Sequence, residues 1–192
     1  MLVWVLLFIS SFIAFSECLD IHINNNYNNA NNFINNHEHF TAKVIKITDG
    51  DTIWVMAENG TKYKIRLLGV DTPEIYHKNS PEKFYINNHP ITNITYLKVW
   101  GYKAKDYAKN ELGNKTVVVV FDNKAPKKGY YGRYLAYIYV DGRDFNEELI
   151  KNGYARVYVS NFELKNEYLK EERYAKENRI GLWNLSKLKY NN

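Results

Sequence analysis

The sequence predicts an α+β protein that is mainly β, a five-stranded OB-fold barrel with about three α-helices. Short β-branched and aromatic runs alternate with strong turn signals over residues 42–70, and two similar runs follow further along the chain. Helical spacing and two helix N-terminal signatures account for the segments between and after them. With 192 residues, 45% of them hydrophobic, the chain has material for one core, so we expect a single domain without internal repeats.

The first three strands follow from turn chemistry. Residues 42–48 (AKVIKIT) alternate between apolar and polar side chains, and Asp49-Gly50 then supplies a tight turn. Residues 52–56 resume the β-rich run, and Asn59-Gly60 marks a second turn before residues 61–70. This pattern predicts an antiparallel meander.

The middle of the chain predicts a loop, a helix and two further strands. Residues 75–94 are polar and proline-containing, which indicates an extended surface loop. Apolar residues recur at helical spacing over residues 100–112. Residues 117–121 and 134–140 have strand composition, and a basic loop joins them, residues 124–129.

Two further helices are predicted from capping signatures. Asp144 with Glu147 forms a capping box, and Gly153 lies where a helix-ending glycine is common. Ser160 with Glu163 repeats the signature ahead of a charged segment, which we expect to be the C-terminal helix.

The N-terminal segment, residues 1–18, reads as a secretory signal. It is almost purely apolar over residues 1–15, shorter than the roughly 20 residues of a transmembrane helix. We therefore expect a secreted or extracytoplasmic protein without a stable membrane partner. The absence of Lys and Arg before the apolar run leaves an uncleaved anchor as the alternative. Cys18 is the only cysteine, so an internal disulfide is excluded.

Residues 19–39 are rich in asparagine, and we expect a disordered spacer. Within it His37-Glu38-His39 is expected to be solvated rather than to bind a metal. The folded domain is predicted to cover residues 40–186, with residues 187–192 as a tail.

The charge balance favours an anionic partner. The formal net charge is +5, and the 17 tyrosines add aromatic surface, as in many proteins that bind a polyphosphate backbone. Basic proteins without an acidic partner are also common, so the motifs must decide.

Two aspartates are predicted to converge at the open end of the second hairpin. A two-residue hairpin loop places Asp51 opposite Leu68, and Asp71 then lies about 10 Å further along the strand. Two carboxylates at such a short separation favour a hard cation such as calcium or magnesium over zinc. The alternative is that each aspartate only forms a turn, beside Gly50 or Pro73.

Neighbouring charged residues favour the catalytic interpretation. Arg66 projects from the third strand, Glu74 follows Asp71 closely, and Arg133 begins a later strand. Phosphodiester hydrolysis uses such a set: a cation against a phosphate oxygen, a carboxylate that activates water, and guanidinium groups that stabilise developing charge.

Three segments closely resemble the signature segments of the staphylococcal nuclease (thermonuclease) family, and they occur in the family's order. They are DGDT at 49–52, RLLGVDTPE at 66–74 and YGRYLAYIYVDG at 131–142. GYARVYV at 153–159 and GLW at 181–183 are similar to its C-terminal half, so the resemblance covers roughly residues 40–183.

The resemblance implies a calcium-dependent nuclease that cuts DNA and RNA. It implies that Ca²⁺ is held by the carboxylates of Asp51 and Asp71 and by the main-chain carbonyl of Thr72. Glu74 would orient or deprotonate the attacking water.

The resemblance also assigns the phosphate and nucleotide contacts. Arg66 and Arg133 would bind the scissile phosphate and stabilise its five-coordinate state. Tyr131 would contact the nucleotide's phosphate, and Tyr158 corresponds to a tyrosine beside the base. Release of the 5′-oxygen would leave 3′-phosphate ends.

Three features depart from the family pattern. Tyr130 replaces a lysine, and Ser160 replaces a second base-flanking tyrosine, so base stacking is expected to be weaker. The loop at 75–94 is longer than in the bacterial enzyme and follows Glu74 directly, where it can alter substrate access.

Two alternatives to a nuclease remain. Related domains that bind nucleic acid without cutting it lose the acidic and arginine residues, all of which are retained here. An oligosaccharide-binding barrel has only the aromatic content in its favour. We therefore expect a monomeric enzyme with DNA and RNA substrates.

Overall fold

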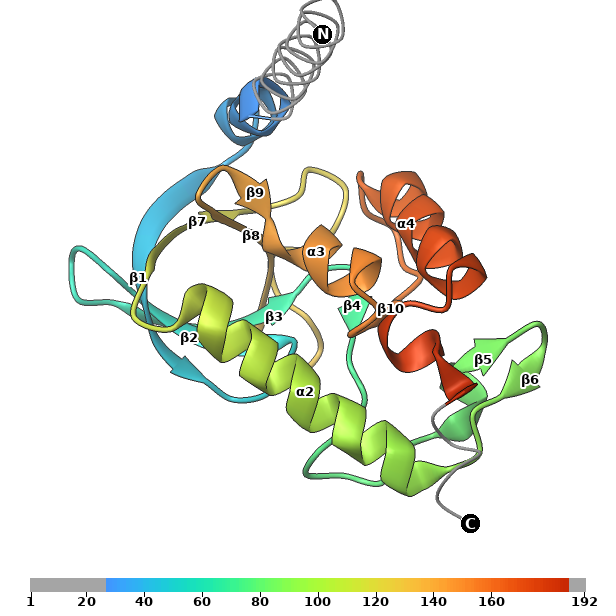
Figure 1. Ribbon diagram of the computed structural model, residues 1–192. Coiled ribbons are helices and arrows are strands. Elements are labelled where there is room, and N and C mark those ends of the chain that lie inside the picture. The colour runs from blue at the N-terminus through green and yellow to red at the C-terminus, as the bar shows by residue number, and fades with distance from the viewer. Residues whose placement is uncertain (1–26, 187–192) are drawn as a thin grey trace, which may run out of the picture.

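The computed structural model describes residues 27–186 and shows a closed five-stranded barrel. The antiparallel order is β3-β2-β1-β7-β8, and a parallel pairing of β3 with β8 closes the ring (Figure 1). The predicted α+β barrel is therefore confirmed. Its strands are β1 His39–Ile47, β2 Thr52–Ala57, β3 Lys62–Leu67, β7 Thr116–Val120 and β8 Tyr134–Val140.

The barrel interior is filled by the β-branched residues that predicted its strands. Burial of a valine or isoleucine side chain contributes about 1.5–3 kcal/mol to the stability of the fold relative to leaving it exposed. Because alternate residues of a strand face opposite sides, one face of every strand enters the core. Side chains with no exposed area come from four of the strands: Ile53, Val55, Ile65, Val119 and Ile138.

The β2–β3 hairpin loop is one residue longer than predicted. Ala57 and Thr61 close it, and Gly60 takes a positive φ of 81°. Asp51 therefore lies opposite Leu67, whose N–H donates to the Asp51 carbonyl at 2.9 Å, and not opposite Leu68. A three-residue loop with glycine in the left-handed position explains the shift.

The long helix begins earlier than its hydrophobic spacing predicts. It is α2, Ile94–Leu112, and the Asn93 side chain caps it by accepting the Tyr96 N–H at 2.8 Å. The preceding segment is not an extended surface loop as expected. It contains η1 Pro81–Lys83 and a small hairpin, β5 Tyr85–Ile86 with β6 His89–Pro90. Phe84 and Ile91 are buried within it, which anchors the segment to the domain.

One of the two predicted capping boxes is confirmed at its first residue. Asp144 accepts the N–H groups of Asn146 and Glu147 at the start of α3, Phe145–Lys151. The C-terminal helix α4, Lys165–Glu177, has Leu164 at its N-cap, so the Ser160 and Glu163 box is wrong. The Glu163 N–H donates instead to Asp122 at 2.8 Å.

The described part of the expected spacer is ordered. Residues 27–35 are helical, and Phe33 and Ile34 pack against the barrel core. His37 is not solvated: its ring stacks on Phe33 with centroids 4.0 Å apart and hydrogen-bonds Glu163. Burial of these side chains outweighs the asparagine-rich composition.

The remaining terminal expectations lie outside the described residues. They concern the signal at 1–18, the spacer up to residue 26 and the tail at 187–192. Within residues 27–186, no helix combines the length and the apolar character needed to cross a bilayer.

A second apolar cluster holds the C-terminal elements beside the barrel. It joins α2, α4, the β5–β6 hairpin and η2, Gly181–Trp183 (Figure 1). Two short strands connect it to the barrel edge, β4 Val70–Asp71 and β10 Arg156–Val157. A third short strand, β9 Arg143–Asp144, pairs antiparallel with the end of β8. The β4–β10 pairing places Arg156 directly opposite Asp71.

Candidate active site

The first buried carboxylate belongs to the tight turn between β1 and β2. Asp51 accepts hydrogen bonds from the Thr72 N–H at 2.9 Å, the Thr72 hydroxyl at 3.0 Å and the Thr52 hydroxyl at 3.1 Å. Gly50 lets the turn approach α2, because a Cβ there would lie 2.7 Å from the Ala104 Cβ. The carboxylate is therefore fixed by its neighbours on both sides.

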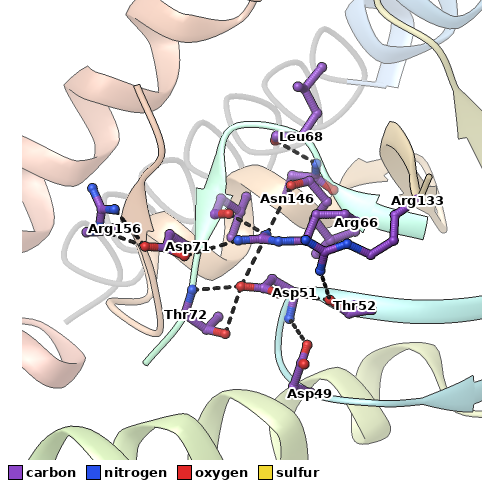
Figure 2. Close-up of polar contacts among 12 residues, drawn as sticks. Asp49, Asp51, Thr52, Arg66, Leu68, Asp71, Thr72, Arg133, Asn146 and Arg156 are labelled. Atoms are coloured by element: carbon purple, nitrogen blue, oxygen red, sulfur yellow. Dashed lines mark hydrogen bonds and ion pairs between the residues drawn. The ribbon is translucent and has the colours of Figure 1, made fainter. Parts of the chain in front are cut away.

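Arg66 joins the two predicted carboxylates. Its Nη1 lies 3.1 Å from Asp51 Oδ2, and its Nη2 donates to Asp71 Oδ1 at 3.1 Å (Figure 2). Nη1 also donates to the Val70 carbonyl at 2.5 Å. Because one guanidinium reaches both carboxylates, the structure brings Asp51 and Asp71 to one place, which we call the carboxylate corner.

Arg156 completes the carboxylate corner and was not predicted from the sequence. Its Nε and Nη2 both donate to Asp71 Oδ2, at 3.0 and 2.6 Å (Figure 2). Each Asp71 oxygen thus has its own arginine. The pairing of two short strands that are far apart in sequence creates this contact. No local pattern could have indicated it.

The donor chemistry of the carboxylate corner fits a hard divalent cation. Asp51 and Asp71 offer carboxylate oxygens, and the backbone of Thr72 lies against Asp51, to which its N–H donates. Over residues 27–186 no group of three or more His, Cys, Asp or Glu side chains is arranged to hold a metal ion. Calcium and magnesium accept carbonyl and water oxygens beside one or two carboxylates, whereas zinc sites use nitrogen and sulfur ligands.

A second carboxyl group, that of Asp49, lies in the turn that carries Asp51. Burial, and secondarily the neighbouring Asp51 carboxylate, raise the pKa of Asp49 from 3.8 to about 7. Arg66 acts in the opposite direction. The turn is therefore an acidic environment that positive charge stabilises.

Glu74 is held by its backbone and leaves its carboxylate available. The Glu74 N–H donates to Asn79 Oδ1 at 2.7 Å, and Asn79 Nδ2 donates to the Glu74 carbonyl at 2.9 Å. Asn79 is only 3% exposed. The half-buried Glu74 carboxylate makes no hydrogen bond or ion pair within residues 27–186. A carboxylate without a structural partner remains able to accept a proton.

Arg133 approaches the same corner from the neighbouring strand. It precedes β8, which runs parallel to β3 with Leu135 opposite Arg66. Its Nη1 lies 3.5 Å from the Thr52 hydroxyl, a weak contact that leaves most of its donors available (Figure 2). Arg66 and Arg133 thus reach the corner from adjacent strands.

The two predicted nucleotide-contacting tyrosines differ in their placement. Tyr131 is 80% exposed, and the Arg133 guanidinium carbon lies 5.8 Å from its ring centroid. Tyr158 is 52% exposed and is positioned by its N–H, which donates to the Gly69 carbonyl. Tyr131 is therefore linked to the corner, whereas no side-chain hydrogen bond or cation–π contact joins Tyr158 to the corner within residues 27–186.

Fold and site together define a small barrel protein with carboxylates and arginines gathered in one polar corner. Residues 64–185, more than half of the chain, match the family of staphylococcal nuclease homologues. The chain belongs to this family.

Individual relatives agree with the assignment. An uncharacterized protein, MJ1439, of Methanocaldococcus jannaschii is 61% identical over 165 residues, which cover 83% of this chain and 79% of that protein. The thermonuclease of Staphylococcus hyicus is 32% identical over 74% of this chain and 75% of its own. The endonuclease YncB of Bacillus subtilis is 32% identical over 78% of this chain and 67% of its own.

Proposed function

We propose that this protein is a calcium-dependent nuclease that hydrolyses phosphodiester bonds in DNA and RNA. The observation that carries the proposal is the convergence of Asp51, Asp71 and Arg66 in one buried corner, with Arg133 beside it. Relatives whose names describe a thermonuclease and an endonuclease support it.

In this proposal Asp51, Asp71 and the main-chain carbonyl of Thr72 hold the calcium ion. When bound, calcium supplies positive charge against an oxygen of the scissile phosphate. Arg156 keeps the Asp71 carboxylate in place by holding Oδ2, so Oδ1 faces the corner.

Glu74 orients or deprotonates the attacking water. Its carboxylate has no competing partner within the described residues, and the Asn79 contacts fix the backbone from which it extends. General-base assistance of this kind contributes about 10²–10⁴-fold to a rate.

Arg66 and Arg133 bind the scissile phosphate and stabilise its five-coordinate state. Arg66 uses Nη1 and Nη2 within the corner, and its Nε–H makes no hydrogen bond to another group of residues 27–186. Preorganised donors aimed at developing charge cost no reorganisation during the reaction. The 5′-oxygen leaves and the product carries a 3′-phosphate. Tyr131 contacts the nucleotide's phosphate, and Tyr158 lies beside the base.

Metal dependence tests the proposal directly. The purified protein should degrade labelled single-stranded DNA and RNA in calcium, and a calcium chelator should stop both reactions. Calorimetric titration of Ca²⁺ into the protein, and into Asp51→Asn as a control, reports ion binding without reference to activity. Full activity in chelator would contradict the role of the ion. If the protein binds single-stranded DNA and RNA but cleaves neither of them in any condition tested, an inactive binding module is favoured instead.

The localisation proposal has its own test. Residues 1–18 direct export and are removed, so N-terminal sequencing of protein from the culture medium should begin after residue 18. A protein that stays cell-associated with an intact N-terminus would indicate an anchor.

A further inference from the structure

We propose that Tyr130, at the tip of the β7–β8 hairpin, is a stacking platform for an unpaired base next to the scissile phosphate. This inference rests on the proposed nuclease function and deepens it. It names the substrate form, a single strand, and a residue that recognises it.

The hairpin tip is a closed turn that presents two tyrosines. The Gly132 N–H donates to the Gly129 carbonyl at 2.9 Å, which makes Tyr130 and Tyr131 the central residues of a turn. The Gly129 N–H donates to the Arg133 carbonyl, also at 2.9 Å. Gly132 has a φ of 72°, which suits the residue that follows such a turn. The backbone hydrogen bonds therefore fix the position of both residues at the tip.

A fully exposed tyrosine is an unusual residue at the centre of such a turn. The residue is 97% exposed, more than any other large hydrophobic residue among those described. Turn centres favour glycine, proline, asparagine, aspartate and serine, and an exposed ring gains nothing from burial. A local rule broken without a packing gain is typical of a functional position.

A series of contacts connects Tyr130 to the carboxylate corner. Its ring meets the Tyr131 ring edge-on, with centroids 5.3 Å apart and planes at 90°. Tyr131 lies against the Arg133 guanidinium, and Arg133 reaches Thr52, whose hydroxyl bonds Asp51. A phosphate bound by Arg133 would thus have its neighbouring base within reach of the tip.

Basic side chains on the same hairpin suit a phosphate backbone. Lys124, Lys127 and Lys128 are exposed along the loop that leads to the tip. Lys127 pairs with Glu38 at 2.5 Å, whereas Lys128 lies over the Tyr134 ring at 4.6 Å and has no carboxylate partner in residues 27–186. Interleaved basic and aromatic residues are the pattern of proteins that bind single strands. Paired bases in a duplex are stacked on one another and cannot reach such a ring.

The test separates base stacking from phosphate contact. Affinity is measured by fluorescence anisotropy in the Glu74→Gln background with calcium present, so that the strand is bound without rapid cleavage. Two labelled strands of equal length are compared, one of deoxythymidines and one entirely abasic. Tyr130→Ala should lower the affinity for the thymidine strand about 5- to 20-fold and leave the affinity for the abasic strand unchanged. Tyr130→Phe should retain the parent's affinity for both.

A lysine variant supplies the contrasting result. Lys128→Ala should lower the affinity for both strands by the same factor. It should also reduce the slope of log affinity against log salt by about 0.7. Tyr130→Ala should leave that slope unchanged, because stacking releases no counterions. Tyr174→Ala is the matched control, since Tyr174 is 51% exposed on α4, away from the β7–β8 hairpin.

The outcomes distinguish this inference from the proposed function. Equal affinity of Tyr130→Ala and its parent for the thymidine strand would overturn the platform while the nuclease proposal stands. Equal losses on both strands would also overturn it, since they would show a backbone contact. If the Glu74→Gln parent binds neither strand and the wild type cuts neither, both proposals fail.

Discussion

The carboxylate corner and the β7–β8 hairpin tip lie next to each other but are built in opposite ways. In the corner Asp51 and Asp71 are 5% and 7% exposed, and arginines and threonines contact every carboxylate oxygen. At the tip Tyr130 and Tyr131 are 97% and 80% exposed, and the backbone hydrogen bonds of the turn fix where they lie. Under the proposed function the difference matches two tasks: positioning charge for chemistry, and leaving surface free for a substrate.

The same difference determines how substitutions can be interpreted. Removing one partner of a buried charge pair costs about 3–5 kcal/mol, because the other charge is left uncompensated. Variants of the corner therefore alter stability and activity together. Exposed tip residues change stability by less than about 0.5 kcal/mol, so their effects report on binding. Variants of Glu74 and Asn146 test whether effects on activity and on stability can be separated near the corner.

Glu74→Gln should produce the largest effect on rate with almost none on stability. We expect a loss of about 10²–10⁴-fold in kcat, because the general base is removed, while KM and the melting temperature stay near those of the wild type. Its carboxylate has no structural partner within the described residues, unlike those of the corner. Steady-state kinetics and thermal melts measure both. A rise in KM as large as the fall in kcat would show that Glu74 binds substrate instead.

Asn146→Ala should be the most destabilising single change next to the site. Asn146 is fully buried; its Nδ2 donates to the carbonyls of Leu68 and Ala136, and its Oδ1 accepts the Ile138 N–H. Leaving these groups unsatisfied should cost about 2–4 kcal/mol in urea unfolding.

The matched control is Asn152→Ala, whose exposed amide donates, among the described residues, to the Glu148 carbonyl and to the Tyr107 hydroxyl. It should cost about 0.5 kcal/mol. Equal costs for the two variants would mean that α3 does not support the barrel through Asn146.

The sequence predicted the barrel because local rules and the fold agree in its strands. Alternating β-branched residues and the Asn59-Gly60 turn are local signals, and they place Arg66 of β3 opposite Thr52, the residue that follows Asp51. The register was wrong by one residue, since loop length cannot be read from a turn dipeptide alone. That shift did not separate the carboxylates, because Arg66 holds both.

The features that the sequence missed depend on contacts between distant segments. Arg156 meets Asp71 only because β10 pairs with β4, and Phe84 and Ile91 are buried only because the C-terminal elements cover them. Residues 27–35 were expected to be disordered by composition, yet Phe33 finds a place on the barrel core. Composition averages over a segment, whereas one or two anchoring side chains decide its order.

Arg156→Met tests whether the corner is one connected network. The substitution removes both donors to Asp71 Oδ2 but leaves Arg66 paired with Oδ1, so the Asp71 charge is not left uncompensated. We therefore expect a loss of about 1.5–3 kcal/mol in stability, less than for an unpaired buried charge. Combined with Asp71→Asn, the double variant should lose less than the sum of the two single variants, with a coupling energy of about 1–3 kcal/mol. Additive losses in urea unfolding would show that Arg156 and Asp71 act independently.

Asp144 extends the comparison to a buried carboxylate without a cation. Burial raises its pKa from 3.8 to about 7, although the Tyr168 hydroxyl, which donates at 2.7 Å, and two backbone N–H groups act in the opposite direction. Between pH 4 and 7 the folded protein therefore binds more protons at this residue than the unfolded chain. Its contribution to stability is complete below about pH 4 and is lost as the pH rises to about 7, with a slope of at most about 1.4 kcal/mol per pH unit.

Asp144→Asn should remove this dependence while its amide oxygen still accepts the N–H groups of the helix cap. Its NH2 group then faces the Tyr168 hydroxyl, which must accept a hydrogen bond instead of donating one. Urea unfolding from pH 4 to 8 should show the variant gaining on the wild type as the pH rises to 7, with no further gain above it. Asp141→Asn is the control, because its bond to Lys115 lowers the pKa of Asp141 and it titrates below this range. If wild type and Asp144→Asn follow parallel curves, the Asp144 carboxylate is stabilised by its hydrogen bonds alone, and burial without a cation is no burden at this position.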